Sequence, residues 1–171
     1  SIAMDKEISK RIFIKNKIRT PKFLKLNNFD LIKNKNKLIK KIEKKLKFPV
    51  VIKPVDEGSS VDVNICNKKN IIKNLKKLHS YKEVLLEQYI GGREIQVAIM
   101  GNKKLGVIEL SPKRLFYDYK AKYNVKAGTK HIIPVDLIKK KYDEVLNLAF
   151  KAHKLIGCRG VTRSDFKYFK G

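Results

Sequence analysis

The segment 49–66 constrains the fold of this chain more than any other stretch. It reads PVVIKPVDEGSSVDVNIC, an apolar run that ends in Lys53, then a polar loop with the Gly-Ser-Ser triplet 58–60, then a run with apolar residues at alternate positions. The pattern predicts strands at 50–53 and 61–66 that are joined by the polar loop. Exposed backbone N–H groups, two hydroxyls and the lysine ammonium could then converge on a phosphate.

Apolar periodicity along the rest of the chain predicts a mixed sequence of helices and strands. Asp136 is the expected N-cap and Gly157 the stop signal of the longest helix. Because strands often follow one another directly, we expect an α+β fold with largely antiparallel sheets and helices on one side. The predicted helices cover 4–14, 29–47, 68–79 and 136–156, and the further strands cover 83–90, 93–100, 105–110 and 160–168.

The segment 113–130 shows no clean period and is predicted to be a long loop of polar and aromatic residues. Long loops in compact domains are usually functional. In the last predicted strand, Val161, Arg163 and Asp165 share one face because side chains alternate along a strand. Charged groups are therefore expected both in this loop and on the final strand.

The formal net charge of +25 raises the possibility of a nucleic-acid-binding module. The 41 basic residues are 35 lysines and 6 arginines, and 20 isoleucines and 12 asparagines accompany them along the whole chain. Arginine is preferred for bidentate phosphate and base contacts. We therefore interpret the lysines mainly as solvated surface residues that reflect AT-rich codon usage, and expect no nucleic-acid partner.

Other features narrow the class of protein. No run approaches the ~20 apolar residues of a membrane span, and Ser1 begins no signal peptide, so we expect a cytosolic internal fragment without a membrane partner. Cys66 and Cys158 lack metal-ligand spacing and are expected to be reduced. The three histidines, at 79, 131 and 153, form no constellation in the sequence.

The two familiar phosphate-binding loops, GxxxxGKS/T and GxGxxG, are both absent. Glu87 and Glu94 instead stand seven residues apart across the predicted Gly91-Gly92 turn. Carboxylates accept hydrogen bonds, so one could face an adenine amino group and the other ribose hydroxyls. The alternative is that both are ordinary surface glutamates.

Seven short motifs occur in one order along nearly the whole chain, and together they resemble the D-alanine–D-alanine ligase family of ATP-grasp ligases. This resemblance implies an ATP-grasp fold, incomplete here, with a central lobe at 1–94 and a partial C-terminal lobe at 95–171. The motifs are Met4-Asp5-Lys6, Val51-Ile52-Lys53-Pro54, Glu57-Gly58-Ser59-Ser60-Val61, Leu86-Glu87-Gln88-Tyr89-Ile90, Gly92-Arg93-Glu94, Phe116-Tyr117-Asp118-Tyr119 with Ala121-Lys122-Tyr123, and Gly157-Cys158-Arg159-Gly160 with Arg163-Ser164-Asp165-Phe166.

The resemblance also implies an activity, the joining of two D-alanines for peptidoglycan through a D-alanyl phosphate, with ATP and Mg²⁺ (or Mn²⁺). Phosphoryl transfer depends mostly on positioning and charge stabilisation, which suits the residue types present. The implied roles are ATP phosphate binding by Lys6, Lys53 and Lys122, adenine recognition by Glu87, Gln88, Tyr89 and Ile90, ribose binding by Glu94, stabilisation of transferring charge by Arg163, and metal binding by Asp165.

The family resemblance further implies that Ser59 and Tyr123 join in one hydrogen-bonded network when a loop closes over the site. Ligases that make an ester with D-lactate tend to lack this tyrosine, so we expect a dipeptide product. Replacing Tyr123 with Phe is predicted to raise the share of D-lactate incorporated, and an unchanged amide-to-ester ratio would contradict this role.

Two parts that the family contains are missing from the 171 residues, an N-terminal α/β domain and a Glu-x-Asn metal motif after the final strand. We therefore expect this polypeptide alone to lack ligase activity and to retain weak nucleotide binding. The complete protein is expected to be a bacterial cytoplasmic homodimer. A different ATP-grasp carboxylate-amine ligase and a basic nucleic-acid-binding module remain the alternatives.

Overall fold

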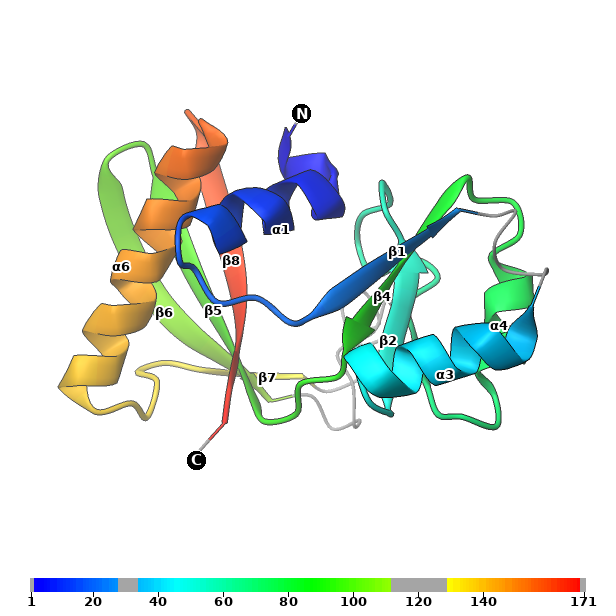
Figure 1. Ribbon diagram of the computed structural model, residues 1–171. Helices are drawn as coiled ribbons and strands as arrows, with labels where there is room; N and C mark the ends of the chain where they lie inside the picture. Colours follow the sequence, from blue (N-terminus) through cyan, green and yellow to red (C-terminus); the bar gives the residue numbers. More distant parts are fainter. Residues whose placement is uncertain (1, 28–33, 112–128, 170–171) are drawn as a thin grey trace. The chain divides into compact units, whose positions relative to one another are not determined.

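The computed structural model describes residues 2–27, 34–111 and 129–169. These residues form two four-stranded sheets in which all the strand pairs are antiparallel, which confirms the predicted α+β class (Figure 1). The chain divides into two compact units, Ser1–Arg11 with Arg19–Ile90, and Ile12–Ile18 with Gly91–Gly171. The functional lobes proposed at 1–94 and 95–171 stay a prediction, and the structural units change over at Ile90 and Gly91.

The sheet of the first unit has the strand order β1-β4-β2-β3 and buries one face against two helices. Alternate strand residues such as Ile52, Val84 and Leu86 point into this apolar core, where Ile42 and Leu75 meet them from the helices. The strands are β1 (Phe23–Asn27), β2 (Val50–Pro54), β3 (Asn64–Cys66) and β4 (Glu83–Gln88), and the helices are α3 (Lys35–Lys45) and α4 (Ile71–Lys77).

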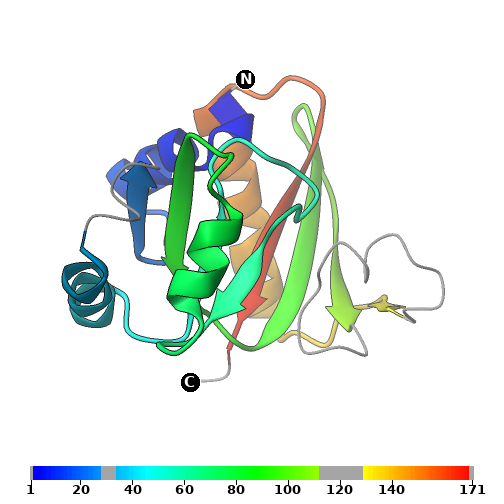
Figure 2. The same ribbon diagram turned by 90° about the vertical axis from the view of Figure 1, so that its right-hand side faces the viewer.

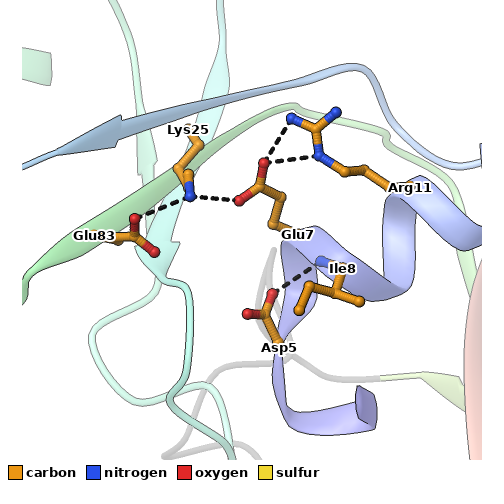
Figure 3. Close-up of polar contacts among 6 residues, drawn as sticks. All are labelled: Asp5, Glu7, Ile8, Arg11, Lys25 and Glu83. Carbon is orange, nitrogen blue, oxygen red and sulfur yellow. Dashed lines mark hydrogen bonds and ion pairs between the residues drawn. The ribbon is translucent and has the colours of Figure 1, made fainter.

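Side chains from the opposite face of the β4 strand meet helix α1 (Lys6–Lys15), which follows the short 3-10 helix η1 (Ile2–Met4). The Asp5 carboxylate accepts a hydrogen bond from the Ile8 N–H at 2.9 Å and so caps the first turn of α1 (Figure 3). Along β4, Glu83 and Glu87 alternate with the core residues Val84 and Leu86. The sheet is therefore apolar on one face and carries these two charges on the other.

The sheet of the second unit has the strand order β7-β6-β5-β8, and one long helix packs on it. Ile95, Val97 and Ile99 of one of the two inner strands meet Val145 and Ala149 of the helix in the core. Figure 2 shows this helix, drawn in orange, beside the sheet. The strands are β5 (Arg93–Met100), β6 (Lys103–Ser111), β7 (Lys130–Ile132) and β8 (Val161–Tyr168), and the helix is α6 (Lys139–Ile156).

The predicted N-cap of the long helix is wrong. Helix α6 has Ile138 as its N-cap residue, with no capping hydrogen bond from a side chain, so it begins later than Asp136 predicts. A local bond from the Leu137 N–H to the Val135 carbonyl, 2.9 Å, occupies this stretch, and the Asp136 carbonyl accepts from Arg93 Nη1 at 2.8 Å. Gly157 ends the helix in the left-handed conformation at φ 74°, as predicted.

The second strand of the loop motif is shorter than predicted. Ser59, Ser60 and Asp62 have φ values of 51°, 61° and 53°, and residues in this left-handed region cannot extend a β-ladder. Strand β3 therefore begins at Asn64 rather than at residue 61. The sequence also does not predict the short strands β1 and β7.

The remaining predicted elements agree with the structure within a few residues at their ends. The helix predicted over 29–47 is confirmed at Lys35–Lys45, after the N-cap Asn34, and residues 28–33 lie outside the described part. The strand predicted over 93–100 has these same bounds. Among the described residues, no helix has both the length and the apolar character that crossing a bilayer requires.

Candidate functional site

Lys6 fixes the backbone that leads into the Gly-Ser-Ser loop. Its Nζ donates to the carbonyl oxygen of Val55 at 3.0 Å and also to that of Glu57. Burial lowers the pKa of Lys6, and the nearby ammonium of Lys53 lowers it further. The side chain of Lys6, a predicted phosphate ligand, thus contacts the segment that precedes the loop. Lys6 is half-buried, and its ammonium lies near that of Lys53.

Glu87 is a buried carboxylate held by two lysines. Its Oε2 lies 2.6 Å from Lys53 Nζ and its Oε1 lies 2.9 Å from Lys10 Nζ. Only 8% of the residue is exposed. Burial by itself raises the pKa of Glu87, but attraction to Lys53 and Lys10 outweighs it, so the pKa lies below the usual value. Two residues predicted for separate tasks, Lys53 and Glu87, are therefore in direct contact.

Lys10 is the member of this cluster that the sequence analysis does not single out. It is 6% exposed, and its Nζ also donates to Thr20 Oγ1 and lies 5.3 Å from the centroid of the Phe23 ring. Burial lowers the pKa of Lys10, and attraction to Glu87 opposes that effect. The one available signal is its position four residues after Lys6, which places both lysines on one face of α1.

A second group of ion pairs joins the same helix to the sheet through Glu7 (Figure 3). Its carboxylate lies 2.7 Å from Arg11 Nη2 and 2.7 Å from Lys25 Nζ, and Lys25 also pairs with Glu83 at 2.9 Å. The hydrogen bond from Lys25 lowers the pKa of Glu7, although burial opposes it. This group contains no residue predicted for the site and is a matched structural counterpart of the Glu87 cluster.

The Gly-Ser-Ser loop itself is formed by two consecutive turns. The Val61 N–H bonds the Gly58 carbonyl at 3.0 Å and the Val63 N–H bonds the Ser60 carbonyl at 3.4 Å. After the loop, the Tyr81 hydroxyl donates to Asp62 Oδ2 at 2.6 Å. Contacts therefore hold the backbone on both sides of the loop, while Gly58 and Ser59 are exposed.

The residues predicted to border the adenine follow Glu87 at the end of β4. The Gln88 N–H bonds the Lys22 carbonyl at 2.9 Å, and the Tyr89 N–H bonds the Pro49 carbonyl at 3.3 Å. Gln88, Tyr89 and Ile90 are half-buried. Their backbone is thus fixed by neighbouring segments of the first unit, and each side chain keeps some exposed surface.

In the second unit, Glu94 and the three charged residues of β8, Arg163, Asp165 and Lys167, lie on the sheet face opposite the α6 core. Glu94 faces Lys167 across the β5–β8 pair, with Oε2 2.8 Å from Nζ. Arg163 Nε donates to Asp165 Oδ1 at 2.8 Å, and both side chains are about half exposed. The prediction that Arg163 and Asp165 share a face is confirmed by the alternating exposure along β8.

Gln96 is a further polar residue of this face. It is the cross-strand partner of Asp165 and is only 5% exposed, yet its Nε2 has no hydrogen-bond partner among the described residues. A buried amide without a partner is uncommon in folded proteins. The sequence analysis does not identify Gln96, because a glutamine in an alternating strand carries no distinctive signal.

The donor set for a magnesium ion is incomplete in the described parts of the chain. Asp165 could supply one oxygen, but residues 2–27, 34–111 and 129–169 contain no group of three or more His, Cys, Asp or Glu side chains that could hold a metal. Mg²⁺ prefers six oxygen ligands. Lys122 and Tyr123, predicted for phosphate binding and for the network with Ser59, lie outside the described residues.

The two antiparallel sheets match the fold of the ATP-grasp ligases. The chain superposes on D-alanine–D-alanine ligase from Bacillus anthracis with a TM-score of 0.80 and 33% identity, over 98% of this chain and 53% of that one. For a D-alanine–D-alanine ligase from Bacillus anthracis complexed with ATP, the TM-score is 0.77 at 28% identity, over 98% of this chain and 51% of that one. For the VanG D-Ala:D-Ser ligase of Enterococcus faecalis, it is 0.80 at 27% identity, over 98% and 49%.

The chain belongs to the D-alanine–D-alanine ligase family. The family model described as the C-terminus of D-Ala-D-Ala ligase matches residues 12–171. A D-alanine–D-alanine ligase of Pelagibacter ubique is 66% identical over 171 residues, which are 100% of this chain and 55% of the relative. D-alanine–D-alanine ligase B of Clostridium tetani is 37% identical, over 97% and 47%. The chain thus spans about half the length of these relatives, and the predicted family is confirmed.

Proposed function

We propose that this chain supplies the nucleotide-binding part of an ATP-dependent D-alanine–D-alanine ligase. The observation that carries the proposal is the arrangement of Lys6, Lys53 and Glu87 beside the exposed Gly-Ser-Ser loop of the first unit. Two cations beside exposed backbone N–H groups and hydroxyls suit a polyphosphate. An ionised, buried carboxylate suits a hydrogen-bond donor such as the amino group of adenine.

Each proposed contact uses chemistry that the side chain can supply. Lys6 and Lys53 hold the negatively charged phosphates, and Glu94 keeps one carboxylate oxygen that does not bond Lys167, which could accept from a ribose hydroxyl. The Arg163 guanidinium offsets charge that develops on the transferred phosphoryl group. ATP would supply that group to the carboxylate of the first D-alanine, and the amine of the second would then displace the phosphate.

The remaining site roles are extensions of the same proposal. Asp165 binds a divalent cation together with ligands beyond the described residues. Lys122 contacts phosphate, and Ser59 and Tyr123 share a network over the site. The complete enzyme is a homodimer in the bacterial cytoplasm, with small-molecule substrates and no nucleic-acid or membrane partner.

Nucleotide binding to the 171-residue chain tests the proposal. We expect isothermal titration calorimetry to detect ATP binding, and the Lys53→Met variant to weaken it by about 10- to 100-fold, because a charge-assisted hydrogen bond contributes roughly 1.5–3 kcal/mol. Lys25→Met is the matched control, since Lys25 also pairs with two carboxylates, Glu7 of α1 and Glu83 of β4, but is absent from the proposed site. Thermal melting of each variant shows that it is folded.

The basic composition suggests the main alternative, a nucleic-acid-binding module, whose binding behaviour would contradict the proposal. With a net charge of +25, a nucleic-acid-binding module would bind a DNA or RNA oligonucleotide with steep salt dependence. Such binding, combined with no response to ATP by calorimetry or thermal shift, would replace the ligase proposal with the nucleic-acid alternative.

A further inference from the structure

Lys10 contacts the Glu87 carboxylate but is too deeply buried to bind a ligand directly. Its side chain is 8% exposed, and its Nζ reaches Glu87 Oε1 at 2.9 Å and Thr20 Oγ1. The ring of Phe23, the β1 partner of Glu87, lies beside the same ammonium. The position of the Lys10 ammonium is therefore set by helix α1, by Phe23 of β1 and by Thr20. Lys10 in turn orients one carboxylate oxygen of Glu87.

The two lysines leave Glu87 with a defined remaining capacity. A carboxylate has about four acceptor positions, and the bonds to Lys10 and Lys53 use one on each oxygen. As long as the group is ionised, every remaining position accepts and none donates. A ligand group that meets Glu87 must then supply an N–H or O–H.

We propose that Lys10 is a specificity-determining positioning residue that keeps the Glu87 carboxylate ionised and oriented. The site then selects nucleobases that present an amino group to Glu87 over those that present a carbonyl oxygen there. The inference rests on the proposed function, because it takes Glu87 to face the nucleobase. The class of ligand selected is an adenine nucleotide, and the class rejected is a hypoxanthine nucleotide.

The surroundings of Glu87 explain why losing Lys10 would change this selection. The charged groups that act on Glu87 are Lys10 and Lys6 from α1 and Lys53 from β2, and its cross-strand neighbours Phe23 and Val51 carry no charge. Burial raises the pKa of Glu87 and the lysines counteract it. With Lys10 removed, burial is opposed by fewer cations, so the pKa rises, and a protonated Glu87 could donate to a carbonyl oxygen.

Affinities of the 171-residue chain for ATP and ITP test the inference, since ITP carries a carbonyl oxygen in place of the adenine amino group. We expect the wild-type chain to prefer ATP, and Lys10→Met to reduce the ratio of the two affinities about tenfold, because one mismatched buried hydrogen bond changes binding by about that factor or more. The reduction should be larger at about pH 5.5 than at about pH 8, because protonation of Glu87 is favoured at the lower pH.

Arg11→Met is the matched control. It removes a cation that pairs with a carboxylate, Glu7, on the same helix, and Arg11 does not contact Glu87 in the described structure. The ATP-to-ITP ratio should then stay at the wild-type value at both pH values. If Lys10 had a purely structural role, its replacement would reduce the affinities for ATP and ITP by the same factor. An unchanged ATP-to-ITP affinity ratio in folded Lys10→Met would therefore overturn the inference.

Two further variants decide the matter if Lys10→Met does not fold. Lys10→Arg keeps the charge and should keep the preference for ATP, whereas Glu87→Gln can donate as well as accept and should lose it; wild-type preference in folded Glu87→Gln would overturn the inference. Failure of the proposed function looks different, because then the wild-type chain binds neither nucleotide.

Discussion

At the scale of single residues, the first unit buries charge where apolar side chains would serve stability as well. Glu87 and Lys10 are 8% and 6% exposed, so burial carries a desolvation cost for both. Attraction to the lysines outweighs burial for Glu87, whose pKa is lowered, whereas for Lys10 burial outweighs the attraction to Glu87 and lowers the pKa. Buried, charge-shifted groups of this kind concentrate at functional sites. The burial of these charges is therefore consistent with the nucleotide-binding role that we propose for the cluster.

Tyr81 gives a prediction about the loop at this scale. Its hydroxyl donates to Asp62 at 2.6 Å, and this bond raises the pKa of Tyr81 to about 12. Because the tyrosine holds the far side of the Gly-Ser-Ser loop, Tyr81→Phe should increase amide hydrogen exchange in residues 58–63 several-fold, measured by mass spectrometry. Asp62→Asn should show a smaller increase, since the amide oxygen still accepts. Unchanged exchange in Tyr81→Phe would mean that the bond does not restrain the loop.

At the scale of elements, the local sequence pattern predicts the long, periodic helices and strands. It does not predict short strands that form only by pairing with a segment distant in the sequence. Helix α6 and strand β5 carry apolar residues at regular spacing, so their existence follows from the sequence. Strand β1 has five residues and pairs with β4, where Phe23 lies opposite Glu87. Nothing local to β1 encodes that partner, and β7, three exposed residues beside β6, shows no alternation of burial at all.

The same distinction holds for the candidate site. Lys53 and Glu94 stand at recognisable positions beside turns, so the sequence indicates them as candidates. Lys10 is one lysine among 35 until the fold brings it to Glu87, and its role therefore could not be inferred from composition. Pairing across elements also explains why Glu94 meets Lys167, a contact that depends on the register of β5 and β8. Arg163 and Asp165 instead meet within one strand, where side-chain alternation alone places them on the same face.

Gly92 provides a prediction at the element scale, at the start of β5. Its φ is +92°, and a Cβ placed there would lie 2.3 Å from the Tyr168 carbonyl oxygen. Both the left-handed backbone and the clash oppose any side chain, so Gly92→Ala should lower the free energy of unfolding by roughly 2 kcal/mol or more. Chemical denaturation measures this loss. Gly160→Ala is the control, because its added Cβ would meet no atom within 4 Å, and an equal loss there would contradict the steric explanation.

At the scale of the whole molecule, each unit contains at least one buried carboxylate whose ionisation depends on the fold. Glu7 and Glu87 in the first unit and Glu109 in the second all have pKa values below the usual value of 4.5. The unfolded chain therefore binds protons at a higher pH than the folded chain does. Stability from these groups is fully present above about pH 5 and is lost as the pH falls through the folded-state values.

Glu109 isolates this effect in the second unit, where it pairs with Arg93. The Arg93 Nε donates to Glu109 Oε1 at 2.9 Å, and the bonds from Arg93 lower the pKa of Glu109 against the opposing effect of burial. Glu109→Gln should therefore reduce the free energy of unfolding by about 1–2 kcal/mol at neutral pH and should make the melting temperature less sensitive to acidification below about pH 5. Asp143→Asn, in the exposed pair with Lys139, should change neither quantity measurably. The melting temperature of Glu109→Gln could instead equal that of the wild type at neutral pH and decrease as steeply as the wild-type value below about pH 5. That result would show that other carboxylates set the acid stability of this unit.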